Sequence, residues 1–173
     1  MLGNQKRTSA GTSINKNRIP TAFTKFKPSG IVLDYGCGKY INHIKNYCFN
    51  SGCLGYLPYD PYNQPYTLNK PVCDFAYNYG ADMIYCCNVL NVIDSNDGIR
   101  SVLTTIRDMS HERTKIIIQI YEGNKTGEGQ ETKKDCFQRN QSTAYYLDFV
   151  TQIFSPSAFS IIKMSNYIII EKR

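Results

Sequence analysis

Apolar runs alternate with amphipathic segments along the first half of the chain, and this alternation predicts its elements. The apolar run IVL at 31–33 is typical of a strand buried on both faces. Helical spacing of apolar residues predicts a helix over 40–49. Residues 55–60 predict a second strand, which Pro58 places near the edge of a sheet. Residues 61–80, rich in Pro, Asn and Tyr, predict an irregular segment.

The second half of the chain continues the alternation and ends in two strands. In chain order, the pattern predicts a strand over 82–87, a helix capped by Ser95 or Asn96, a buried strand over 115–121, a polar loop over 122–141 and a helix capped by Ser142. Two final strands, near 158–164 and 167–172, are separated only by Ser165-Asn166. So short a connection predicts an antiparallel hairpin.

Strands that alternate with amphipathic helices are typical of an α/β fold. We therefore predict a Rossmann-like, doubly wound and mostly parallel sheet with helices on both faces, completed by a C-terminal antiparallel hairpin. One domain is expected over residues 30–173, preceded by a basic N-terminal arm over residues 1–29. In such sheets, ligands bind at the carboxyl ends of the strands, near the switch in strand order.

The positive charge of the chain is concentrated at its start. The 173 residues carry a formal net charge of +6. Six basic residues precede the first acidic residue, Asp34: Lys6, Arg7, Lys16, Arg18, Lys25 and Lys27. This arm is interpreted either as a phosphate-contacting segment for nucleic acid or as a solvated terminus. No apolar run approaches the length of a membrane span, so no membrane partner is expected.

The cysteine pattern argues against a disulfide framework and against a zinc site. The chain has seven cysteines, an odd number, and no CxxC pair. No metal is therefore expected. Reduced thiols suit a cytoplasmic location, which is the location we predict.

The turn after the first strand contains the strongest chemical signal. Gly36 and Gly38 allow close approach of the backbone to a ligand. A dinucleotide site requires a third glycine at position 41, and this chain has Ile41. The carboxylate of Asp34, just before the turn, suits a ligand with an ammonium group. Asp60, at the end of the second predicted strand, can accept hydrogen bonds from ribose hydroxyls.

These residues resemble the motifs of class I S-adenosylmethionine-dependent methyltransferases. Residues 32–39, VLDYGCGK, are similar to the first motif of that family, and Asp60 falls where the family places its ribose-binding acid. Residues 87–93, CNVLNVI, resemble the segment that lines the methionine end of the cofactor. The resemblance implies S-adenosylmethionine as cofactor and a cofactor site formed by Asp34, Gly36, Cys37, Gly38, Asp60, Pro61, Cys87 and Asn88.

A narrower similarity, over residues 127–140, is to small phage and bacterial methyltransferase-like proteins of undefined substrate. Two departures from the family pattern stand beside it. Tyr40 occupies a position where the family often has a further glycine. Only twenty-one residues separate Asp60 from Asp82, which is short for the usual helix, third strand and adenine-side acid.

Two hypotheses of function therefore remain open. The first is an active methyltransferase that acts on a small molecule, a nucleotide or nucleic acid. The second is a catalytically inactive domain of the same fold that serves as an interaction module, such as a viral factor acting on a host protein. The intact Asp34, Gly36, Gly38 and Asp60 favour the first hypothesis. Tyr40 and the missing third-strand region between Asp60 and Asp82 favour the second.

The methyl acceptor is not identified by a motif. Enzymes that methylate exocyclic amino groups of bases typically carry Asp/Asn-Pro-Pro-aromatic, where residues 88–91 of this chain are NVLN. The Pro-Cys pair of cytosine-C5 enzymes does not occur in the chain. The polar loop over 122–141 is the expected substrate lid, unless it is merely solvated. Its candidate substrate residues are Lys133, Phe137, Gln138 and Asn140.

Overall fold

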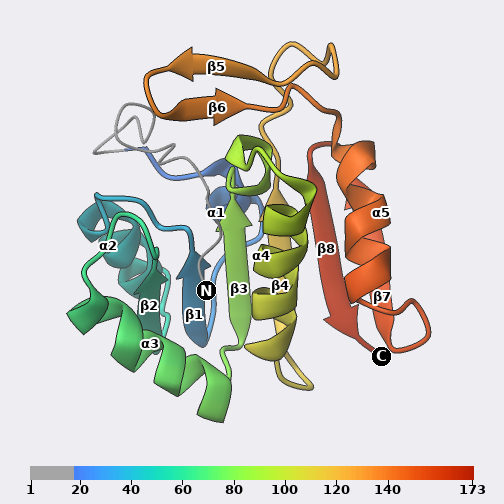
Figure 1. The fold of residues 1–173 in the computed structure, drawn as a ribbon. Coiled ribbons are helices and arrows are strands. Elements are labelled where there is room, and N and C mark those ends of the chain that lie inside the picture. Colours follow the sequence, from blue (N-terminus) through green and yellow to red (C-terminus); the bar gives the residue numbers. More distant parts are fainter. Residues whose placement is uncertain (1–17) are drawn as a thin grey trace.

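A computed structural model describes residues 18–173, and its main feature is one six-stranded sheet (Figure 1). The strand order is β2-β1-β3-β4-β8-β7. These strands are β1 (Ile31–Tyr35), β2 (Gly55–Tyr59), β3 (Met83–Cys87), β4 (Lys115–Gln119), β7 (Phe159–Met164) and β8 (Tyr167–Lys172). The first four in this order run parallel, and β8 pairs antiparallel with both β4 and β7. The doubly wound, mostly parallel sheet with a C-terminal hairpin is thereby confirmed.

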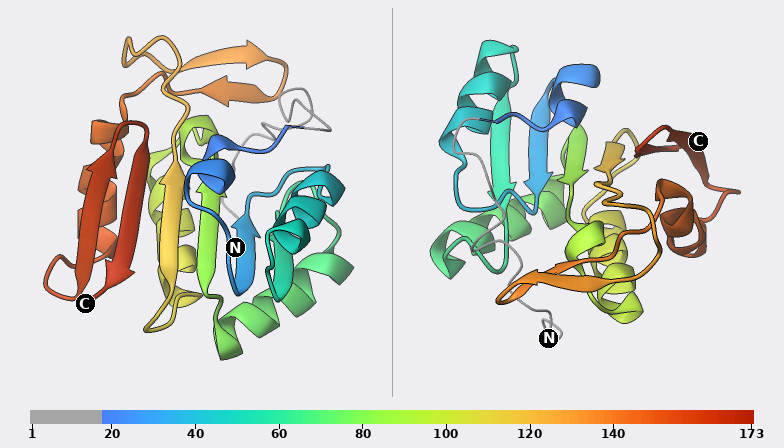
Figure 2. Two further views of the ribbon diagram at one scale, coloured as in Figure 1. Left: turned by 180° about the vertical axis from the view of Figure 1, so that it is seen from behind. Right: turned by 90° about the horizontal axis from the view of Figure 1, so that it is seen from above.

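Helices cover both faces of the sheet, as Figure 2 shows from behind and from above. One face packs against α3 (Tyr66–Tyr79), α4 (Asn96–Asp108) and α5 (Thr143–Ile153). The other packs against α1 (Thr21–Lys25) and α2 (Asn42–Asn50). Side chains alternate along β1, so that Leu33 joins the first core and Val32 the second. Burial on both faces explains the continuous apolar strand sequences.

The described part of the N-terminal arm packs against the sheet. Helix α1 buries Ala22 and Phe23 completely, and the ring of Phe23 stacks on Tyr85 with centroids 3.9 Å apart. The arm was expected to precede the domain as a separate segment, whereas Ala22 and Phe23 of α1 pack into the core. Apolar residues at helical spacing, Ile19, Ala22, Phe23 and Phe26, were the signal for this helix. Lys6, Arg7 and Lys16 lie outside the described residues.

The segment over 61–80 was predicted to be irregular, and this prediction is wrong. Residues 66–79 form α3, a helix with Pro71 in its interior. Its apolar side packs on the sheet through Val72 and Ala76, and this burial outweighs the local cost of the proline. The chain then passes directly to β3, and β2 is the outer strand of the sheet in the described part of the chain. The short spacing from Asp60 to Asp82 therefore accommodates a helix without a further strand.

Replacement of Pro71 by Ala is expected to raise the free energy of unfolding by about 1 kcal/mol. Pro71 is exposed and lacks the N–H that would bond to the carbonyl of Thr67 one turn earlier. The gain stays below the ~3 kcal/mol cost of an interior proline because proline also restricts the unfolded chain. Urea unfolding measures the change. Pro65→Ala at the helix N-cap is the control and should bring no gain; equal effects of the two substitutions would contradict the prediction.

The polar segment over 122–141 is more ordered than a loop. It contains a two-stranded antiparallel hairpin, β5 (Gln130–Lys133) and β6 (Cys136–Gln138), which Figure 1 shows above the carboxyl ends of the central strands. The strands are short, and β5 is exposed along its length. Apolar alternation along the sequence therefore does not reveal these two strands.

One predicted helix cap is confirmed and another is wrong. The Ser95 side chain accepts a hydrogen bond from Gly98 N at the start of α4. Ser142 occupies the N-cap position of α5, but its side chain makes no capping hydrogen bond. The carboxylate of Glu122 accepts instead from Thr143 N at 2.6 Å and from Thr143 Oγ1 at 2.7 Å. A negative charge at a helix N-terminus is favourable. Here it also joins the start of the segment 122–141 to α5.

Candidate functional site

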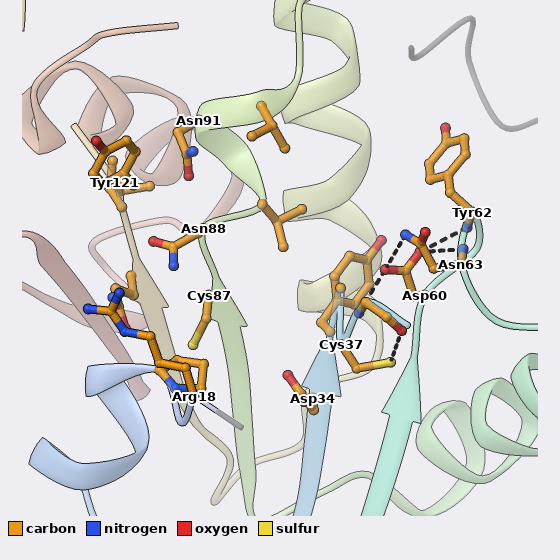
Figure 3. Close-up of a pocket in the computed structure, with 18 of the residues that line it drawn as sticks. Arg18, Asp34, Cys37, Asp60, Tyr62, Asn63, Cys87, Asn88, Asn91 and Tyr121 are labelled. Carbon is orange, nitrogen blue, oxygen red and sulfur yellow. Dashed lines mark hydrogen bonds between the residues drawn. The ribbon is translucent and has the colours of Figure 1, made fainter. Parts of the chain in front are cut away.

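A pocket of about 800 Å³ lies at the carboxyl ends of the parallel strands. The chain runs from β1 outward to β2 and then returns to β3 on the other side of β1, so the strand order switches at this point. Loops from both directions diverge there and leave a crevice beneath the hairpin β5–β6. Figure 3 shows side chains from β1, from the turns after β1 and β2, from β3 and from the N-terminal segment converging on it. Of the predicted cofactor residues, the lining includes Asp34, Gly36, Cys37, Gly38, Asp60, Pro61, Cys87 and Asn88.

The glycine turn brings the backbone of β1 close to the segment after β3. Gly36 has φ +80°, and a Cβ atom built on it would lie 2.3 Å from Cγ2 of Val89. The N–H groups of Gly36 and Cys37 both donate to the carbonyl of Tyr59, at 2.7 and 3.2 Å. The turn is thus bound to the end of β2 and leaves its open side to the pocket. Both the left-handed conformation and the close approach require glycine at position 36.

Asp34 is a buried carboxyl group without a cationic partner among residues 18–173. Its side chain is 2% exposed, and Oδ2 accepts a hydrogen bond of 2.6 Å from the hydroxyl of Tyr56. Burial raises the pKa of Asp34 to about 7, although the bond from Tyr56 opposes the rise. A buried acid that ionises near neutral pH is suited to a ligand that supplies a positive charge.

Asp60 lies at the other side of the turn, and protein donors surround it. Oδ1 accepts from the N–H groups of Tyr62 and Asn63, each at 2.9 Å. Oδ2 accepts from Gly38 N and from Asn63 Nδ2, each at 3.0 Å. Dashed lines in Figure 3 mark these bonds. Asp60 therefore joins the glycine turn to the turn that follows β2.

Asn88 begins the segment after β3 and adopts a strained conformation. Its φ is +59°, in the left-handed region, and its N–H donates to the carbonyl of Gln119 at 2.8 Å. Non-glycine residues in this region are sparse and gather at functional sites. Burial raises the pKa of the neighbouring Cys87 thiol, which therefore stays protonated at neutral pH. In Figure 3 both residues lie between Asp34 and Asn91.

The four predicted substrate residues separate into two groups. Lys133 and Phe137 lie on the hairpin and line the pocket, as does Gln138. Gln138 is held by two hydrogen bonds: Nε2 donates to the carbonyl of Tyr121, and Oε1 accepts from Asn91 Nδ2, both at 3.0 Å. Asn140 is buried outside the pocket lining, where its Nδ2 donates to the carbonyl of Glu128. The amide of Asn140 therefore closes the base of the hairpin, and a role of this residue in substrate binding stays a prediction.

Several pocket residues were missed by the sequence reasoning. Arg18 and Thr21 come from the N-terminal segment, and Gln119 and Tyr121 from the end of β4. Thr21 Oγ1 lies 2.7 Å from the hydroxyl of Tyr167, and Ala22 N donates to Gln119 Oε1 at 2.8 Å. These contacts make the N-terminal segment a wall of the pocket. The helical spacing of apolar residues in α1 was the sequence signal for this wall. That spacing does not indicate that α1 packs against β4 and β8.

Residues 18–173 were also compared with the requirements of a metal site and of a membrane-spanning helix. No group of three or more His, Cys, Asp or Glu side chains there is arranged to hold a metal ion. None of the helices in the same range has the length and apolar character needed to cross a membrane.

Comparisons with known proteins support the fold. No protein-family model and no curated protein matches the chain. The chain is 12% identical to Burkholderia thailandensis 1,6-didemethyltoxoflavin-N1-methyltransferase, solved with 1,6-didemethyltoxoflavin and S-adenosylhomocysteine bound. That similarity has a TM-score of 0.57 and covers 87% of this chain and 73% of the other.

Two further solved structures are similar. The PH0226 protein of Pyrococcus horikoshii is 10% identical, with a TM-score of 0.54 and coverage of 88% of this chain and 86% of that one. Human N-acetylserotonin methyltransferase, in complex with S-adenosylmethionine, is 14% identical, with a TM-score of 0.51. The similarity to the human enzyme covers 83% of this chain but only 47% of that enzyme. The chain therefore has the fold of S-adenosylmethionine-dependent methyltransferases.

Proposed function

We propose that the protein is an S-adenosylmethionine-dependent methyltransferase. The observation that carries this proposal is Asp34, a buried carboxyl group without a described cationic partner, beside a glycine turn in a large pocket of a methyltransferase fold. An isolated buried carboxylate is costly, so a ligand that supplies a positive charge stabilises it. S-adenosylmethionine carries both an ammonium and a sulfonium group.

The residues around the pocket fit this cofactor. Asp34 would pair with the ammonium group of the cofactor. The turn Gly36-Cys37-Gly38 would let the cofactor approach the protein backbone closely. Cys87 and Asn88 would border the methionine end, and Asp60 with Pro61 the ribose end. A cavity of about 800 Å³ is within the range of ligand pockets and leaves room for an acceptor beside the cofactor. The fold and the neighbours solved with this cofactor or its product support the assignment.

The cofactor, when bound, supplies a methyl group on a sulfonium, which an acceptor nucleophile attacks in line. The contribution of the protein is mainly to hold the two reactants in that geometry. The sheet and its turns are rigid and would fix the cofactor, while the hairpin β5–β6 would position the acceptor and exclude water. No general base is assigned, because an acceptor that needs no deprotonation requires none.

For the acceptor we propose a small molecule or a nucleotide. Lys133, Phe137 and Gln138 offer a cation, an aromatic face and an amide from the hairpin. Arg18 adds a second cation from the N-terminal segment. The Burkholderia thailandensis neighbour was solved with the small molecule 1,6-didemethyltoxoflavin bound, which supports the choice. A nucleic-acid substrate would additionally use the basic residues at the start of the chain, and its binding would weaken steeply with salt.

Calorimetric titration of the full chain with S-adenosylmethionine tests the proposal. We expect binding that strengthens about fivefold between pH 6 and pH 7, because Asp34 ionises near pH 7 while the α-amino group of the ligand, with an ordinary pKa of about 7.7–8.0, stays charged over that range. Asp34→Asn should weaken binding at pH 8 by at least about tenfold and remove this pH dependence. Asp148→Asn, at an exposed position on α5, is the matched control and should change neither property.

The alternative function, an inactive interaction module, makes the opposite prediction. Tyr40 lines the pocket, is 42% exposed, and follows the glycine turn by two residues, so its side chain would compete with the cofactor for space. No heat at millimolar S-adenosylmethionine would overturn the methyltransferase proposal in favour of this module. If Tyr40→Gly then restored binding, the tyrosine would be the cause.

A further inference from the structure

We propose that Asp60 is a positioning residue that clamps the glycine turn, and that it does not accept the ribose hydroxyls of the cofactor. This inference rests on the proposed function and concerns how the same site selects its ligand. It departs from the role that the sequence resemblance implies for the acid at the end of β2. Its consequence is that the pocket distinguishes poorly between ribose and deoxyribose forms of the cofactor.

The bonding capacity of the Asp60 carboxylate is filled by the protein. A carboxylate has about four lone-pair sites, two on each oxygen. Tyr62 N and Asn63 N occupy those of Oδ1, and Gly38 N and Asn63 Nδ2 occupy those of Oδ2. All four distances lie between 2.9 and 3.0 Å. A pair of ribose hydroxyls would have to displace donors that are already well placed.

These donors cannot easily move aside. The donors Gly38 N, Tyr62 N and Asn63 N are backbone groups, which do not rotate away as a side chain does. Only the fourth donor, Asn63 Nδ2, belongs to a side chain. Displacement would leave the buried N–H group of Gly38 without its acceptor and would break three part-buried bonds, which costs free energy that the new bonds must first recover.

The surrounding bonds explain what the clamp achieves. Gln64 Nε2 donates to the carbonyl of Gly38 at 2.6 Å, so both backbone groups of Gly38 are held by the turn after β2. That turn is held in place by Asn69, whose Oδ1 accepts from Asp60 N and whose Nδ2 donates to Asp60 O. Asn69 is buried on α3. The glycine turn is therefore fixed to the first turn of α3 through Asp60, before any ligand arrives.

The direct test compares three ligands of the full wild-type chain by calorimetry: S-adenosylhomocysteine and its 2′-deoxy and 3′-deoxy analogues. We expect each analogue to bind within about fivefold of the parent compound. A charge-assisted pair of hydrogen bonds from Asp60 to the hydroxyls would instead make the loss about tenfold or more. A loss above fivefold for either analogue overturns the inference. Failure of all three to bind would overturn the proposed function instead.

A variant tests the clamp without any ligand. Asp60→Ala removes the acceptor of the Gly38 N–H, so hydrogen exchange at the Gly38 amide should accelerate at least tenfold. The Gly36 amide bonds to Tyr59 O and serves as the internal control, with exchange expected to change less than threefold. Unchanged exchange at Gly38 contradicts the clamp.

The same variant should weaken binding of the parent compound and its analogues by one common factor. Unequal factors would assign Asp60 to the ribose. If the variant does not fold, the wild-type series decides.

Discussion

Replacement of Asp34 by Asn is expected to raise the free energy of unfolding at pH 8 by about 3 kcal/mol in the ligand-free protein. The neutral amide removes a buried charge, while its Oδ1 still accepts a hydrogen bond from the hydroxyl of Tyr56. Urea unfolding over a range of pH measures the effect. A gain in stability that accompanies a loss of cofactor binding would identify Asp34 as a group retained for function at the expense of the fold.

The pH dependence of this effect has a definite sign. The carboxyl of Asp34 has an ordinary pKa of 3.8 in the unfolded chain and about 7 in the folded protein, because burial disfavours its charge. Between these values the unfolded chain has released a proton that the native protein keeps, so wild-type stability falls as the pH rises. The advantage of Asp34→Asn should therefore grow from near zero below pH 4 to its full value above pH 7.

The control for this experiment is Asp148→Asn, an exposed carboxylate on α5. This substitution should change the stability by less than about 0.5 kcal/mol across the whole pH range. The difference in the free energy of unfolding between Asp34→Asn and wild type should depend on pH. A difference that is the same at every pH would contradict the conclusion that wild-type Asp34 becomes a buried charge near neutral pH.

Replacement of Gly36 by Ala is expected to lower the free energy of unfolding by about 3 kcal/mol. The left-handed backbone costs ~1–2 kcal/mol for a residue with a Cβ atom. The remainder comes from the collision of that atom with Val89 Cγ2, which would lie at 2.3 Å. The same collision would push the turn or the segment after β3 into the pocket, so cofactor binding should weaken together with stability.

Two matched variants separate the collision from the backbone strain. Gly52 has φ +89°, and a Cβ atom added to it would meet no other atom within 4 Å, so Gly52→Ala should cost only the ~1–2 kcal/mol of the left-handed backbone. Val89→Ala combined with Gly36→Ala should recover part of the loss, because it removes the colliding methyl group. Equal losses for Gly36→Ala and Gly52→Ala would show that Val89 does not restrict the turn.

Much of the fold could be predicted from the sequence because its signals are local. The apolar run at 31–33, the paired glycines and the two-residue connection at Ser165-Asn166 each specify one strand or turn on their own. Helices α1 and α3 were missed for the opposite reason. Basic charges mask the apolar spacing of α1, and Pro71 argues against a helix that burial against the sheet nevertheless stabilises.

The roles of the site residues divide in a similar way. The sequence alone determined that Asp34, the glycine turn and Asp60 follow the first two strands, and parallel strands bring such residues to one edge of a sheet. How much hydrogen-bonding capacity each side chain keeps depends on the packing of the folded chain. Asp34 remains a buried acid without a described cationic partner, whereas the oxygens of Asp60 are filled and the amide of Asn140 is used in the hairpin. The reason is physical: hydrogen-bond satisfaction and burial depend on neighbours in space, and these come from segments far apart in the chain.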